Sequence, residues 1–98
     1  MSGQRRTLAG MTAHDVPVVV AAVGQYGPFD DGRTIPWTDL VDGDGGGVFR
    51  CTIGEGVNPP RVLATGHASV SFQMRDDGKL RRTLRAFTEG KVAVKEAA

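Results

Sequence analysis

Apolar and polar residues alternate over residues 48–53. Phe49, Cys51 and Ile53 fall on one side of this segment, and the residues between them fall on the other. A period of two is typical of a β-strand with one buried face. The pattern therefore predicts a strand over residues 48–53 that turns these three side chains toward a core.

The same alternation occurs over residues 68–75 and again over residues 80–87. Between them lies Asp76-Asp77-Gly78, a turn sequence whose glycine can take a positive φ at no steric cost. These segments predict an antiparallel hairpin. Arg82 falls on the apolar side of the hairpin, which predicts a position near a barrel end or beside a β-bulge. Apolar side chains of the three strands should share one core, formed by Phe49, Ile53, Val70, Phe72 and Leu84.

Two further strands are predicted upstream of this hairpin. Residues 16–23 are dense in β-branched side chains, which favour a buried strand. Residues 33–41 predict a second strand, in which Pro36 indicates an irregular or edge position. A short helix between residues 55 and 65 has weaker support, because Asn58-Pro59-Pro60 disfavours helical backbone.

Five strands without an internal repeat predict an all-β fold. Closing a small sheet into a barrel protects its edges. We therefore expect a small five-stranded antiparallel Greek-key barrel of the OB-like type, with an SH3-like barrel or a small sandwich as alternatives. Residues 1–15 are expected to form a flexible tail and residues 16–95 the barrel domain. A second copy could cover edge backbone that remains unpaired, so a dimer or higher oligomer is expected.

The composition fits one small globular domain. The 98 residues are 40% hydrophobic and 23% charged. No apolar stretch approaches the roughly 20 residues of a membrane helix, so no membrane partner is expected. With one cysteine and no recognisable export signal, the chain is expected to be cytoplasmic. The bias toward glycine, alanine, valine, arginine and aspartate suggests a GC-rich genome, such as that of an actinobacterium, its phage or its plasmid.

Residues that could carry catalysis or bind a metal form no recognisable motif. His14 and His67 lie in different contexts, and Cys51 has no partner at metal-ligand spacing. The segment that begins at Asp42 resembles a calcium loop, but the twelfth position, normally glutamate, is Ile53. We therefore expect no enzyme activity, no metal site and no cofactor.

Arginine residues mark the surface best suited to binding. The net charge of +1 is unevenly distributed, because most of the positive excess lies between residues 75 and 85. Arginines neutralise phosphates and aromatic rings stack on bases, which is the chemistry of a single-strand nucleic-acid platform. Outward positions on the predicted strands and nearby aromatic positions supply the candidate binding residues, which are Arg33, Arg50, Arg75, Lys79, Arg81, Arg85, Tyr26, Phe29, Trp37 and Phe87.

Several of these candidates have a purely structural alternative. Outward arginines commonly belong to a solvated face, and Tyr26 and Phe29 could instead anchor the first long loop. Trp37, the single tryptophan, could fill the core. Phe87 lies on the outward side unless a one-residue bulge near Arg82 inverts the strand.

From Gly32 to Ala93 the chain resembles the small single-stranded-DNA-binding proteins of filamentous phages and related plasmids. The similar parts are residues 32–41, the strand 48–53 followed by Gly54-Glu55-Gly56, and the hairpin 68–87. The resemblance implies an OB-fold dimer that coats single strands without sequence preference. It also implies that Arg33, Arg50 and the aromatic residues near the groove are the matching positions.

Together these observations favour sequence-independent binding of single-stranded DNA, in the replication or transfer of a phage or plasmid. The alternative is a protein-interaction or structural module, such as a phage virion accessory protein. Both functions occur on small β-barrels, and a fold does not fix a function.

Overall fold

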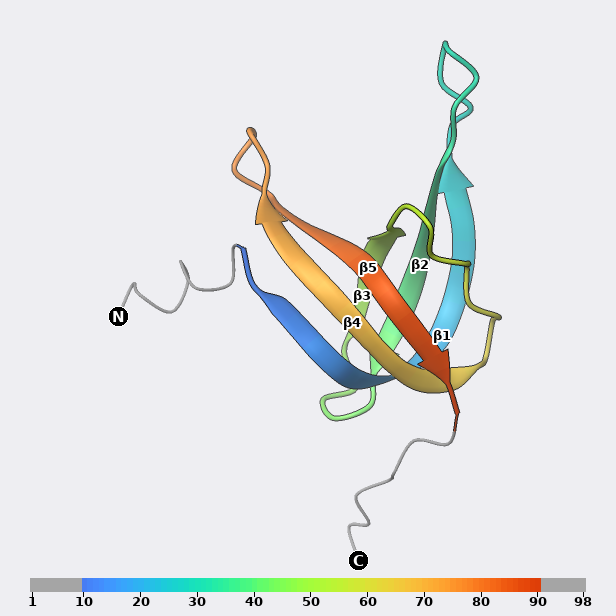
Figure 1. Cartoon of the computed structure of the whole chain (residues 1–98), viewed down its shortest axis with the longest axis vertical. Helices are drawn as coiled ribbons and strands as arrows, with labels where there is room; N and C mark the ends of the chain where they lie inside the picture. Colours follow the sequence, from blue (N-terminus) through green and yellow to red (C-terminus); the bar gives the residue numbers. More distant parts are fainter. Residues whose placement is uncertain (1–9, 91–98) are drawn as a thin grey trace, which may run out of the picture.

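The computed structural model describes residues 10–90, which form five β-strands joined by loops and turns (Figure 1). The strands are β1 (Thr12–Tyr26), β2 (Ile35–Asp42), β3 (Val48–Ile53), β4 (Thr65–Met74) and β5 (Leu80–Glu89). They close into a barrel in the order β1-β2-β3-β5-β4. Neighbouring strands are antiparallel except β3 and β5, which run parallel. The predicted five-stranded barrel is confirmed, with one parallel pair that the sequence did not indicate.

Strand positions follow the sequence pattern, and the largest difference lies in β1. β3 spans the predicted residues, and the hairpin turns where predicted, with Gly78 at a φ of 84°. β1 begins at Thr12 and ends at Tyr26, so it extends beyond the predicted strand at both ends and overlaps the predicted tail. The rest of that tail, residues 1–9, and the predicted domain end at residue 95 lie outside the described residues.

The segment between β3 and β4 forms turns and loop, so the short helix considered there is absent. Within residues 10–90 there is no helix of the length and apolar character needed to span a bilayer.

Aliphatic side chains fill the barrel. The buried cluster takes residues from every strand and from the loop before β4, namely Val18, Val20, Leu40, Cys51, Ile53, Ala64, Ala68, Val70 and Leu84. Phe49 and Phe72 are partly exposed and pack against this cluster. The predicted common core is therefore confirmed, because all five of its residues belong to the cluster or contact it.

A β-bulge in β5 changes which side chains face the core. The pairing between the strands steps from Ser69–Ala86 to Val70–Leu84, so β5 contains one additional residue, Arg85. One inserted residue inverts a period of two. Beyond the bulge, Phe87 therefore packs against the core, while Ala86 is exposed. The outward orientation of Phe87 that simple alternation predicts is wrong, and the bulge alternative applies.

Two connections extend away from the barrel on the same side of the view in Figure 1. These are the β1–β2 loop (residues 27–34), drawn in teal, and the β4–β5 turn (residues 75–79), drawn in orange. The surface near these two connections contains most of the predicted binding residues.

Candidate nucleic-acid interface

Four side chains from three strands meet on the outer face of β1, β2 and β3, and we call them the aromatic–arginine cluster: Tyr26, Trp37, Asp39 and Arg50. Thr38 and Leu40 are buried in the barrel, so the residues that alternate with them in β2 face outward. The antiparallel register places Asp39 directly opposite Arg50. Trp37, left open by the sequence, therefore belongs to the outer face.

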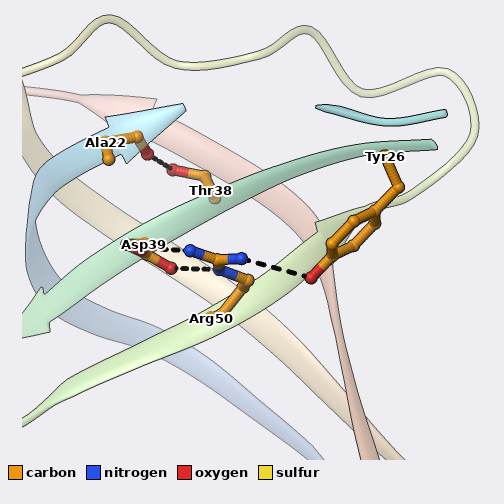
Figure 2. A network of polar contacts seen from close by, with 5 residues as sticks. All are labelled: Ala22, Tyr26, Thr38, Asp39 and Arg50. Atoms are coloured by element: carbon orange, nitrogen blue, oxygen red, sulfur yellow. Dashed lines mark hydrogen bonds and ion pairs between the residues drawn. The ribbon is translucent and has the colours of Figure 1, made fainter. Parts of the chain in front are cut away.

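Arg50 is held by contacts with the other three members of the cluster. Its Nε and Nη2 donate hydrogen bonds to the two carboxylate oxygens of Asp39, at 2.7 and 3.1 Å (Figure 2). Its Nη1 donates to the hydroxyl of Tyr26 at 3.4 Å. The guanidinium carbon lies 3.6 Å from the centroid of the Trp37 ring. A bidentate ion pair and a cation–π contact together fix the plane of the guanidinium.

A glycine in β1 makes room for the indole ring. Gly24 pairs with Trp37 across β1 and β2, and a Cβ atom at position 24 would lie 2.5 Å from Cζ2 of the ring. Any larger residue would therefore displace the indole. The Tyr26 ring completes the cluster, with its centroid 6.1 Å from that of Trp37 and the planes inclined at 42°.

The ion pair fixes the charges of both partners. The hydrogen bond from Arg50 lowers the pKa of Asp39 below its ordinary value. The hydrogen bond to Asp39, followed by the one to Tyr26, raises the pKa of Arg50. Both groups therefore stay ionised at neutral pH, and the pair contributes almost no net charge to this face.

A groove of about 360 Å³ adjoins the aromatic–arginine cluster, and we call it the arginine groove. It lies between β3 and the start of β5, and the β4–β5 turn forms part of its wall. Its lining residues are Tyr26, Ile35, Arg50, Thr52, Arg75, Leu80, Arg81 and Arg82. Among the described residues that line it there are four arginines and no acidic side chain.

Comparisons with protein families, with curated proteins and with solved structures find no match to this chain. The chemistry of the site therefore rests on its own residues. Residues 10–90 contain no group of three His, Cys, Asp or Glu side chains that could hold a metal ion.

The arginine groove brings together four of the ten predicted binding residues, Tyr26, Arg50, Arg75 and Arg81. Trp37 lies beside the groove, in contact with Arg50. The groove therefore combines residues that are distant in sequence, from the end of β1 to the start of β5.

The other predicted residues lie elsewhere. Phe29 and Arg33 line a separate hollow in the β1–β2 loop, where Arg33 forms an ion pair with Asp31 at 2.6 Å. Arg85 donates a hydrogen bond from Nε to Ser71 Oγ at 2.9 Å and does not line the groove. Lys79 is the last residue of the β4–β5 turn and also lies outside the lining, and Phe87 packs against the core.

Sequence reasoning missed three contributors to the site. Asp39 is recognisable only when the β2–β3 register is known, because it lies eleven residues from Arg50 in the chain. Gly24 contributes by leaving space for the Trp37 ring, and this contact is not visible in the sequence. Arg82 stood out as a break in the alternation of β5. It pairs with Phe72 and lines a second hollow with Asp42 and Phe49 on the core side of the sheet, which accounts for that break.

Proposed function

We propose that this protein binds single-stranded DNA in the arginine groove, without sequence preference. The observation that carries the proposal is the composition of the lining, which has four arginines, a tyrosine and no acidic residue among the described residues. Arginines neutralise phosphates, and tyrosine rings and guanidinium planes stack on any base. Contacts of these kinds carry little sequence information.

The position of the groove supports the proposal. Barrels of the OB type bind oligonucleotides on the outer face of strands 2 and 3, between the loop after strand 1 and the loop after strand 4. The arginine groove combines Arg50 and Thr52 of β3 with Arg75 of the β4–β5 turn. A protein of this kind would coat single strands during replication or transfer of a phage or plasmid, and its expected dimerisation stays a prediction.

The charges in the groove set the expected strength of phosphate binding. Asp39 balances the charge of Arg50, and Arg75 lies 3.6 Å from Asp77 in an exposed pair that salt readily screens. Arg82 pairs with Phe72 and also lines the core-side hollow that contains Asp42. Arg75 and Arg81 are thus the two outward cations of the lining that are available to phosphates. If each neutralises one phosphate, the logarithm of the affinity should fall with the logarithm of salt concentration at a slope of about −1.4.

Fluorescence anisotropy of labelled oligo-dT at several salt concentrations tests the proposal. Arg81→Ala should weaken binding to all sequences alike and flatten the salt slope by about 0.7, because one phosphate contact is lost. Arg61→Ala is the matched control. Arg61 is also exposed, but it pairs with Glu89 and does not line the groove.

Two results would contradict the proposal. One is the absence of oligo-dT binding at low salt, which would favour the protein-interaction alternative. The other is an equal loss of affinity in the Arg81 and Arg61 variants, because general charge would then explain the binding.

A further inference from the structure

Trp37 is the largest aromatic residue of the aromatic–arginine cluster, but its ring is already covered by protein atoms. The ring packs so closely on Gly24 that a Cβ atom there would lie 2.5 Å from it. The guanidinium carbon of Arg50 lies 3.6 Å from the ring centroid. A base could stack directly on the indole only after displacing Arg50, which three hydrogen bonds hold in place.

The hydrogen bonds of Arg50 also occupy the edges of its guanidinium. The edge formed by Nε and Nη2 binds the Asp39 carboxylate, and Nη1 donates to Tyr26. Arginine binds phosphate through such an edge, with paired N–H donors in the guanidinium plane. Asp39 therefore occupies one of the two edges through which Arg50 could bind a phosphate in a bidentate manner, and Tyr26 engages a donor of the other edge.

The flat face of the guanidinium remains accessible. Arg50 lines the arginine groove, and 45% of its side-chain surface is exposed. One face of the plane packs on the Trp37 ring, so the opposite face is the one left for a stacked base. Guanidinium planes stack on unpaired bases in single-stranded complexes.

We propose that Asp39 converts Arg50 from a phosphate ligand into a stacking surface for a nucleobase. Asp39 and Tyr26 hold the guanidinium flat on Trp37, and the base stacks on its free face. Asp39 is a positioning residue in this arrangement, because it acts only through Arg50. The inference rests on the proposed function and assigns base stacking to the cluster and phosphate binding to the other outward arginines of the groove.

Two DNA probes separate stacking from phosphate binding: labelled oligo-dT and an abasic strand of the same length. The wild-type protein should bind oligo-dT about 5- to 150-fold more tightly than the abasic strand, the range expected for one stacked base. In Asp39→Asn, Arg50 is free to turn toward a phosphate. The preference for oligo-dT should fall toward unity, and the salt slope should steepen by about 0.7.

Two further variants complete the test. Asp31→Asn removes the same negative charge from the β1–β2 loop, where Asp31 pairs with Arg33, so it corrects for the general effect of charge. Arg50→Lys keeps the positive charge but lacks the plane, so it should also lose the preference for oligo-dT over the abasic strand. If Asp39→Asn does not fold, Arg50→Lys alone tests the stacking role of Arg50.

The failures of the two proposals are distinguishable. If the wild-type protein binds oligo-dT but neither Asp39→Asn nor Arg50→Lys changes the preference for bases, the stacking role is wrong and DNA binding stands. If Asp39→Asn and Asp31→Asn change the preference and the salt slope equally, the positioning role of Asp39 is wrong. If the wild-type protein binds neither probe, both proposals fail.

Discussion

The hydroxyl of Thr38 donates a hydrogen bond of 2.9 Å to the carbonyl oxygen of Ala22, beside an irregularity in β1 (Figure 2). The pairing steps from Val20–Leu40 to Ala22–Asp39, so β1 has one additional residue, Ala21. A bulge disrupts the regular ladder of backbone hydrogen bonds. The buried hydroxyl of Thr38 supplies a partner to a carbonyl next to this point.

Replacing Thr38 with valine keeps the shape of the side chain but removes this donor. Thr38→Val should lower the free energy of unfolding by about 1–3 kcal/mol, the cost of leaving a buried polar group without its partner. Urea denaturation measures the change. Thr88→Val is a matched control, because Thr88 is exposed on β5. Equal losses in the two variants would show that the hydrogen bond to Ala22 contributes nothing specific.

Leu84 is fully buried in the core, whereas Leu63 is 76% exposed in the loop before β4. Leu84→Ala should reduce the free energy of unfolding by about 2–5 kcal/mol, because it removes buried methyl groups and leaves a cavity. Leu63→Ala should change it by less than about 0.5 kcal/mol. Denaturant titration of both variants compares the same substitution at a buried and an exposed site. A small loss for Leu84→Ala would contradict the observed packing of β5.

Cys51 is the single cysteine, and burial raises its pKa to about 12. The thiolate is the reactive form of cysteine, so the folded protein should react very slowly with a thiol reagent at pH 8. The reaction should become fast in a denaturant. Absorbance measured with an aromatic disulfide reagent, with and without guanidinium chloride, tests this directly. Equally fast reaction in both conditions would place the thiol at the surface.

The ion pair between Asp39 and Arg50 should make stability depend on pH. The folded protein has a lowered Asp39 pKa, whereas the unfolded chain should have a value of about 3.9. The contribution of the ionised carboxylate is therefore complete above the unfolded value and is lost as pH falls through the folded value. The stability difference between the wild type and Asp39→Asn should be constant from about pH 5 to 7 and shrink below about pH 4.

Unfolding titrations across this pH range measure that difference. High salt should reduce it at neutral pH, because the Arg50 side chain is 45% exposed and salt screens such pairs. A difference that stays constant down to about pH 2 would exclude Asp39 as the titrating group.

The sequence predicted β3 and the hairpin well because their alternation is local. Every second residue of β3 is apolar, and the glycine of the hairpin turn takes the positive φ that its position requires. The exact position of the bulge at Arg85 could not be predicted from the sequence, because the inserted residue does not differ in type from its neighbours in a recognisable way. Its effect on Phe87 became visible only through the pairing of β4 with β5.

The site was less predictable than the strands. Outward arginines could be recognised from alternation, but their grouping depends on which strands become neighbours. Arg81 reaches the groove beside Arg50 because β5 pairs with β3, whereas Arg85 bonds to Ser71 of β4. The pairing of Asp39 with Arg50 is likewise a property of register, which no local pattern specifies.

The contact between β3 and β5 closes the barrel through a short seam. Two paired positions join these strands, Thr52–Thr83 and Ile53–Leu84, and the Thr52 hydroxyl adds a hydrogen bond of 3.3 Å to the carbonyl of Arg82. Amide hydrogen exchange detects local opening of a sheet, and it can compare this short seam with the longer strand pairs. The arginine groove has walls on both sides of this seam. A DNA strand bound in the groove would contact both β3 and β5 and so oppose their separation. Binding in the groove and local opening of the barrel at this seam would then be thermodynamically linked.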